Sequence, residues 1–170
     1  MIDLLYAFQN LPFAQVARAE IFMSDEQAAH VMFPSLVMVP KTKELTEAQI
    51  KTIEDLSGQT VRDKALKYFT AKSGEMVVID RVLGKHELIT YAIGIDAAGK
   101  VKQIEVLEYK ETYGHEIKRP EWRKQFYGKD KTATIRIKED IQNISGATLS
   151  CKHVTDGVRR ILQTYDFLRT

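Results

Sequence analysis

The residues most able to do chemistry lie in one stretch, residues 140–150, which holds small, hydroxyl and amide side chains in close succession. The small residues Ser145, Gly146 and Ala147 leave backbone N–H groups accessible, and an apolar pattern with helical spacing begins shortly after them. A helix N-terminus carries a partial positive charge and unpaired donors, so a loop of this kind can bind a phosphate. The hydroxyl of Thr148 would lie beside that phosphate and could accept a phosphoester bond. On residue types alone, a plain Ser-Gly turn before a capped helix is the more common meaning of the pattern.

Helical spacing predicts three elements around this stretch. Capping boxes at residues 24–27 and 46–49 begin two short helices, which are expected to end before Pro34 and at Gly58. The longest helix is expected to follow Ser150, a good N-cap residue. Its continuous apolar stripe consists of Val154, Val158, Ile161, Leu162, Tyr165 and Leu168.

Strand patterns fill the middle of the chain. Residues 76–82 are a run of β-formers, and residues 88–95 alternate between apolar and polar positions. A turn at residues 96–99 leads to a return strand over residues 101–109, which predicts an antiparallel hairpin. Residues 132–137 alternate again and are expected to form a further strand.

Strands followed by a helix on one face predict an α+β fold, an antiparallel β-sheet flanked by helices. We expect residues 1–70 to form an N-terminal helical segment that completes the fold, and residues 71–170 to form the main domain. Within the first segment, residues 35–45 are expected to be a connector, and residues 61–69 fit either a strand or a short helix.

Composition excludes several classes of function. The 170 residues carry a net charge of +2 without a stripe of Lys and Arg, so a nucleic-acid partner is not expected. Cys151 is the one cysteine and the four histidines lie far apart, so we expect neither a disulfide nor a metal site. The dinucleotide Gly fingerprint, the G-x-S-x-G motif and the Cys-x-x-Cys motif are absent from the sequence, so no catalytic residues are assigned.

Residues 1–19 are moderately apolar and end in Ala17-Arg18-Ala19, which is similar to the cleavage site of an export signal. Polar residues interrupt the apolar run, and no basic segment precedes it. Two interpretations stay open, the remnant of a signal that starts upstream and a local amphipathic helix packed on the domain. No window approaches the roughly 18 to 20 apolar residues of a membrane span. We expect a periplasmic or otherwise exported protein, with a cytoplasmic location still open.

One hexapeptide changes the interpretation of the phosphate-binding pattern. It is Ser145-Gly146-Ala147-Thr148-Leu149-Ser150, and it resembles the flavinylation motif of the FMN-binding domain family. That family includes the G subunit of the Rnf complex and the C subunit of the sodium-translocating NADH:quinone reductase. In its members, a flavin transferase moves FMN from FAD to the motif threonine through a phosphoester. The resemblance extends over roughly residues 75–165, so residues 71–170 are expected to be an FMN-binding domain.

The resemblance implies a role for two loops. Thr148 would be the covalent FMN acceptor. The rest of the hexapeptide would shape the phosphate loop and be recognised by the transferase, namely Ser145, Gly146, Ala147, Leu149 and Ser150. Residues similar to the family's Glu-Thr-Pro-Gly loop would line the isoalloxazine ring, namely Glu111, Thr112, Tyr113 and Gly114.

Two positions depart from the family pattern. Tyr113 replaces the loop proline, and it could stack on the ring or cover it. Members often have an acid six residues before the acceptor threonine, where this chain has Gln142, with Asp140 two residues earlier. Outside the motifs, we expect Trp122 and Phe126 to pack in the core.

We therefore expect an electron-transfer flavoprotein with FMN bound covalently at Thr148. Its partners would be the flavin transferase and redox proteins or membrane electron-transfer proteins. A carrier is favoured over a stand-alone enzyme because the sequence shows no second recognisable domain. Two alternatives remain: a flavin-dependent reductase of a small acceptor, and a flavin-free structural or sensory domain, which Gln142 favours.

Overall fold

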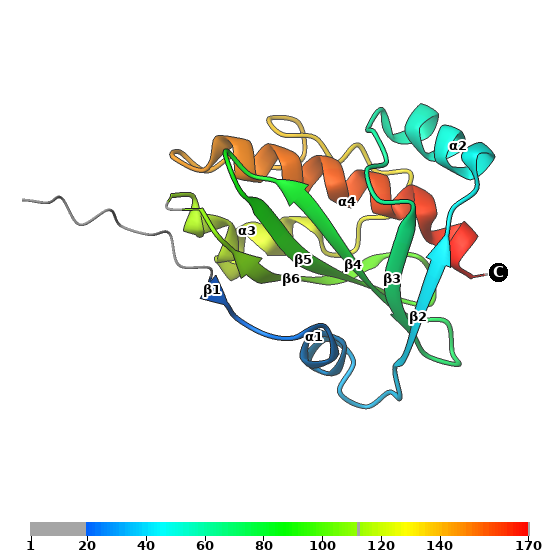
Figure 1. Ribbon diagram of the computed structural model, residues 1–170. Helices are drawn as coiled ribbons and strands as arrows, with labels where there is room; N and C mark the ends of the chain where they lie inside the picture. Colours follow the sequence, from blue (N-terminus) through cyan, green and yellow to red (C-terminus); the bar gives the residue numbers. More distant parts are fainter. Residues whose placement is uncertain (1–19, 112, 170) are drawn as a thin grey trace, which may run out of the picture.

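A six-stranded antiparallel sheet with the strand order β1-β6-β5-β4-β3-β2 dominates the fold (Figure 1). The computed structural model describes residues 20–111 and 113–169. The strands are β1 (Glu20–Ile21), β2 (Val39–Glu44), β3 (Ala65–Thr70), β4 (Met76–Leu83), β5 (Leu88–Ile95) and β6 (Val101–Tyr109). The helices are α1 (Asp25–Met32), α2 (Glu47–Ser57), α3 (Pro120–Arg123) and α4 (Thr148–Leu168), with 3-10 turns η1 (His115–Lys118) and η2 (Lys124–Phe126). The predicted α+β fold is confirmed.

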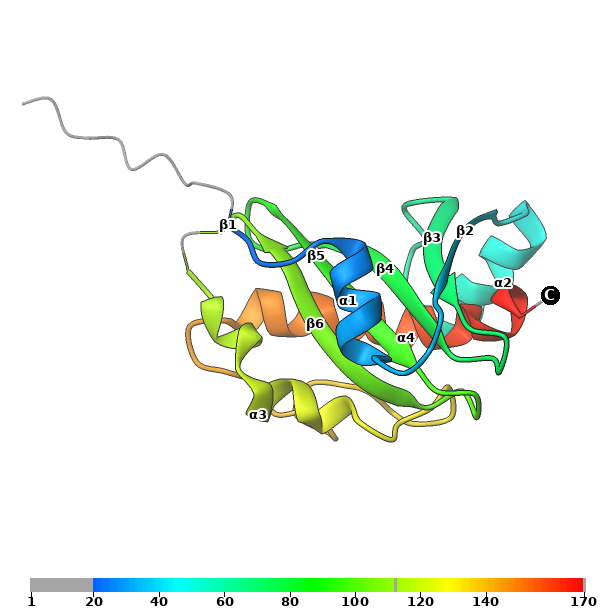
Figure 2. The same ribbon diagram turned by 90° about the horizontal axis from the view of Figure 1, so that it is seen from below.

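The two faces of the sheet carry different helices. The long helix α4 lies along one face with α2 beside it (Figure 1), and α1 crosses the other face, as the view from below shows (Figure 2). The strands β1, β2 and β3 come from residues 20–70 and pair into the same sheet as the later strands. Of the described helices, none combines the length and the apolar character that a membrane crossing needs. The predictions for residues 1–19 lie outside the described residues.

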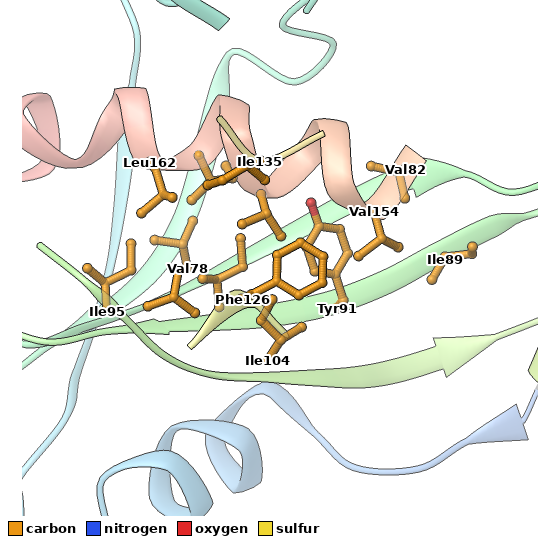
Figure 3. Close-up of a cluster of buried hydrophobic side chains, with 14 of the residues drawn as sticks. Val78, Val82, Ile89, Tyr91, Ile95, Ile104, Phe126, Ile135, Val154 and Leu162 are labelled. Atoms are coloured by element: carbon orange, nitrogen blue, oxygen red, sulfur yellow. The ribbon is translucent and has the colours of Figure 1, made fainter. Parts of the chain in front are cut away.

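The larger core lies between α4 and the sheet. Figure 3 shows side chains of β4, β5 and β6, such as Val78, Tyr91 and Ile104, packed against Val154 and Leu162 of α4. The whole predicted apolar stripe of α4 is buried, and so are Trp122 and Phe126, as expected. Each fully buried aliphatic or aromatic side chain contributes roughly 1.5–3 kcal/mol, so this core fixes α4 on the sheet.

Several local predictions are confirmed. Both capping boxes form, at Ser24 and Thr46, and α2 ends at Gly58 in the left-handed conformation with φ 66°. The predicted hairpin corresponds to β5 and β6, and the preceding run of β-formers is β4. The ambiguous segment at residues 61–69 resolves as the strand β3, which begins at Ala65.

The prediction that residues 35–45 form a connector is wrong in its second half, because β2 pairs with β3 along its whole length. β2 is an edge strand with mostly exposed side chains and the polar sequence Val-Pro-Lys-Thr-Lys-Glu. A strand of this kind has no buried face and therefore no apolar alternation to reveal it.

The prediction that residues 132–137 form a strand is also wrong. The described backbone there makes one isolated bridge, between Ile137 and Ile141, and adopts positive φ at Ile135 (44°) and Lys138 (69°). The Asp140 carboxylate organises this loop, because it accepts the backbone N–H groups of Ile135 at 3.0 Å and Arg136 at 2.8 Å. The apolar alternation reflects a loop that packs Ile135 on the core rather than a strand.

Candidate functional site

A cavity of about 290 Å³ lies where the first turn of α4 meets the loop after β6 and the turn between β4 and β5. This volume is near the lower end of the roughly 300–1,000 Å³ that is usual for small-molecule sites. The lining residues are Lys85, His86, Glu111, Tyr113, Gly146, Ala147, Thr148, Leu149 and Ser150. The structure therefore brings Glu111 and Tyr113 together with most of the hexapeptide. Ser145 and Gly114 are not among the lining residues, and Thr112 lies outside the described residues.

The helix that carries the hexapeptide begins at Thr148, three residues before the predicted start at Cys151. Its N-cap residue is Ala147, and no side chain caps the helix. The prediction that Ser150 is the N-cap is therefore wrong: Ser150 lies inside the first turn, and its Oγ is 3.2 Å from the Tyr109 hydroxyl. An N-terminus without a side-chain acceptor keeps its N–H donors available, as a phosphate site requires.

A glycine turn leads the chain into this helix. Gly146 has φ 87°, a conformation that costs a residue with an L side chain roughly 1–2 kcal/mol. In the same turn, the Ala147 N–H donates to the Ile144 carbonyl at 3.1 Å. A Cβ on Gly146 would meet no atom within 4 Å. Backbone conformation, and not lack of space, therefore explains the glycine at this position.

The Thr148 side chain is exposed at the start of α4, and Asn143 contacts it. The Asn143 amide Nδ2 donates a hydrogen bond of 3.0 Å to Thr148 Oγ1. Sequence reasoning does not find Asn143, because its contact with Thr148 depends on how the glycine turn folds back.

The buried carboxylate of Glu111 forms part of one cavity wall. Its Oε1 accepts the backbone N–H groups of His86 at 2.5 Å and Glu87 at 3.0 Å. Burial by itself raises the pKa of Glu111, but the donated backbone hydrogen bonds outweigh it and hold the pKa below its usual value. Glu111 thus ties the loop after β6 to the β4–β5 turn. Its predicted place beside an isoalloxazine ring stays a prediction.

Tyr109 connects the loop after β6 to the first turn of α4. Its hydroxyl donates to the Tyr113 carbonyl at 2.5 Å and lies 3.2 Å from Ser150 Oγ. Gly114 (φ 91°) makes room for this contact, since a Cβ there would be 2.5 Å from the Tyr109 hydroxyl. Burial raises the pKa of Tyr109, so the hydroxyl stays protonated and able to donate. The sequence shows Tyr109 only as the last residue of a strand.

Two large apolar side chains at the cavity are accessible to solvent. Tyr113 is 78% exposed and Leu149 is 44% exposed. Exposed apolar groups that cluster at a cavity are typical of ligand or protein contact sites. This arrangement is compatible with either of the roles expected for Tyr113, stacking on a ring or covering it.

Gln142, at the position where family members often have an acid, and Asp140, two residues earlier, both have structural contacts. Asp140, besides its backbone contacts, is 2.9 Å from Lys129 Nζ. Burial raises the pKa of Asp140, but the hydrogen bonds of the Arg136 backbone and Lys129 more than offset this and lower it. Gln142 is exposed, and its carbonyl accepts the Trp122 indole N–H at 2.8 Å. Asp140 therefore holds its own loop together through these contacts.

Two further kinds of site among the described residues would be a metal cluster and a reactive thiol. Over residues 20–111 and 113–169, no group of three or more His, Cys, Asp or Glu side chains could hold a metal ion. Cys151 is buried, and that burial raises the pKa of its thiol, which disfavours the reactive thiolate.

Comparison with known proteins identifies the domain that contains the cavity. Residues 84–163 match the family model of the FMN-binding domain, and this range includes every residue that lines the cavity. Searches of curated proteins and of solved structures found no match. The matched region begins at the β4–β5 turn and ends within α4, so it contains all three walls of the cavity. The chain therefore carries, over residues 84–163, a flavin-binding domain of the FMN-binding domain family.

Proposed function

We propose that this chain is an electron-transfer flavoprotein that carries FMN through a phosphoester between the flavin phosphate and Thr148 Oγ1. One observation carries the proposal. The exposed Thr148 hydroxyl lies in the lining of the cavity, at the uncapped N-terminus of α4, in the region that matches the FMN-binding domain. The hydroxyl that would accept FMN, the backbone N–H groups that would bind its phosphate and the cavity thus lie together.

The residues that line the cavity fit FMN. The first-turn N–H donors of α4 would hold the phosphate, with the cation of Lys85 nearby in the cavity lining. The exposed ring of Tyr113 and the side chain of Leu149 would contact the isoalloxazine ring. When bound, FMN supplies one-electron and two-electron redox chemistry, and the protein supplies its orientation and electrostatics.

The attachment step is balanced with FAD as the donor and a flavin transferase as the catalyst. Thr148 Oγ1 attacks the phosphorus on the flavin side of the FAD pyrophosphate. The new bond joins Oγ1 to that phosphorus, the pyrophosphate P–O bond breaks, and AMP leaves with the bond's electron pair. The hydroxyl proton passes to a base of the transferase. Exposure of Thr148 supports this step, because the transferase must reach the hydroxyl.

A carrier role fits the surface around the cavity. Tyr113 and Leu149 form an exposed apolar rim on which a redox protein could dock close to the flavin. We propose soluble or membrane-bound redox proteins as donor and acceptor. A covalent tether prevents loss of FMN where free FMN is scarce, which supports an exported location.

The test is the intact mass of the full chain co-produced with an active flavin transferase. We expect a gain equal to FMN less one water, together with flavin absorbance that survives denaturation. The Thr148→Ala variant should show neither. An unmodified wild-type chain, with the transferase verified on another substrate, would overturn the proposal.

A further inference from the structure

We propose that Asn143 is a positioning residue for the acceptor threonine, whose side-chain amide orients the Thr148 hydroxyl for FMN transfer. This inference rests on the proposed function and adds to it a residue outside the hexapeptide. It concerns how fast the hydroxyl reacts, and not whether the cavity holds a flavin.

The geometry places the amide on the reacting atom. Asn143 Nδ2 is 3.0 Å from Thr148 Oγ1, within ordinary hydrogen-bond distance. The glycine turn at residues 145–146 folds the chain back, so that Asn143 reaches Thr148 in the first turn of α4, five positions later. A direct hydrogen bond to the nucleophilic oxygen is the strongest link a neighbouring side chain can offer it without taking part in the bond change.

The other end of the same amide indicates that the residue is not there for stability. Asn143 Oδ1 is buried and has no hydrogen-bond partner, one of two such side-chain atoms in the part of the chain that the structure describes. A buried polar atom left unpaired destabilises a fold, so an apolar residue would suit this position better on stability alone. The hydrogen bond from Asn143 Nδ2 to Thr148 compensates for the unpaired Oδ1.

The threonine needs such a partner because of where it stands. In a helix, threonine divides between two χ1 rotamers, since its hydroxyl can bond a carbonyl of the preceding turn. Thr148 is the first residue of α4, where the preceding turn does not exist. Asn143 therefore selects one rotamer and holds Oγ1 in a fixed direction.

Asn143 also reaches the hydroxyl without occupying the flavin site. It lines a neighbouring hollow of about 320 Å³ together with Trp122, Gln125 and Gln142, and it is not among the residues that line the flavin cavity. The amide donates to one lone pair of Oγ1. The second lone pair is left to attack the phosphorus, and the hydroxyl proton is left to go to the base of the transferase. Once the ester has formed, the same N–H can still donate to the bridging oxygen.

The experiment measures initial rates of flavinylation by intact mass, with the full chain as the varied substrate of a purified flavin transferase and FAD. We expect Asn143→Ala to lower kcat by about tenfold, the factor that corresponds to one net hydrogen bond, with KM for the chain changed less than about twofold. Asn143→Asp keeps the shape but cannot donate when ionised, so it should lose a similar factor. Gln163→Ala is the matched control, because it removes an amide hydrogen bond of 2.9 Å at the far end of α4.

The outcomes separate cleanly. A wild-type kcat in Asn143→Ala or in Asn143→Asp overturns the positioning role, as does a loss that appears in KM alone. Equal losses in Asn143→Ala and Gln163→Ala would mean that general destabilisation is the cause, and would overturn it as well. If the wild-type chain is itself not modified, the proposed function fails first. Wild-type modification with an unaffected Asn143→Ala variant removes only this inference.

Discussion

The first turn and the middle of α4 belong to one helix and have opposite environments. In the first turn, Thr148 and Leu149 are exposed, and no side chain caps the N-terminus. Roughly two to three turns later, Gly157 and Arg160 are buried against β4 and β5. The helix is therefore fixed to the sheet by its middle, while its first turn stays open to the cavity.

A buried ion pair does the fixing. Both Asp80 oxygens lie 2.7 Å from Arg160 Nη2, and the Tyr91 hydroxyl donates to Asp80. Figure 3 shows the hydroxyl oxygen of Tyr91 directed toward α4. Burial and the Asp80 carboxylate raise the pKa of Tyr91 well above its ordinary value, so it remains a donor. The first turn of α4 therefore faces the cavity, while its middle anchors the helix to the sheet.

The largest expected effect comes from breaking that ion pair. Arg160→Met leaves the Asp80 carboxylate buried without its cation, which should lower the free energy of unfolding by about 3–5 kcal/mol. Urea unfolding checks this. Lys152→Met is the matched control, because it removes a cation from an exposed pair with Asp156 on the same helix and should cost about 0.5 kcal/mol or less. Similar losses in the two variants would contradict the distinction between the two parts of α4.

Gly146, before α4, and Gly157, in its middle, should respond differently to substitution by alanine. A Cβ on Gly157 would lie 2.0 Å from the Tyr91 hydroxyl and 3.0 Å from Val82 Cγ1, so Gly157→Ala should destabilise the fold by about 2–3 kcal/mol. Gly146→Ala meets no atom and bears only the strain of its positive φ, roughly 1–2 kcal/mol. We expect Gly146→Ala to slow flavinylation more than Gly157→Ala does. Thermal unfolding and intact mass, measured on both variants, test the two halves of this prediction.

An intermediate effect is expected at the cavity wall. Glu111→Ala leaves the N–H groups of His86 and Glu87 without their acceptor, at a cost of about 1–3 kcal/mol. The pKa of Glu111 is lowered in the fold, so its stabilisation is complete above the unfolded-state pKa of about 4.3 and disappears as pH falls through the folded value. Wild-type stability should therefore drop as the pH falls below the unfolded-state pKa of Glu111, and the drop should be smaller in Glu111→Ala. Parallel pH curves for the two proteins would show that Glu111 has no such role.

The smallest effect on stability is expected at the mouth of the cavity. Lys85 is exposed, so Lys85→Ala should change the free energy of unfolding by less than about 0.5 kcal/mol. If Lys85 neutralises the flavin phosphate, the same variant should slow flavinylation, and Lys85→Arg should retain the wild-type rate. A rate that does not change in Lys85→Ala would assign the phosphate to the helix N-terminus alone.

Local patterns predict the parts of this fold that have a signal in residue type or spacing. The capping boxes have Ser or Thr three residues before Gln, the hairpin of β5 and β6 and the stripe of α4 have strand and helix periodicity, and all are confirmed. The edge strand β2 has no buried face, and the loop held by Asp140 has alternation without a ladder. The predictions for these two segments fail because backbone pairing with a neighbouring strand, and not the periodicity of the side chains, decides whether a segment forms a strand.

The candidate site divides in the same way. The hexapeptide and the loop after β6 are recognisable from residue types, and the structure places most of them around one cavity. The contacts of Tyr109, Asn143 and the Glu111 carboxylate could not be predicted, because each joins segments whose approach depends on the strand order or on the glycine turn. Sequence reasoning thus points to Thr148, the proposed acceptor, but not to the groups that hold it and its surroundings in place.

The edge strand β2 has a consequence for encounters between copies of the protein. A free strand edge can recruit a strand from a second molecule and begin aggregation. In β2, Pro40 has no N–H to offer, and two lysines, Lys41 and Lys43, make this edge strand basic. The β2 edge is therefore poorly suited to grow by intermolecular strand addition.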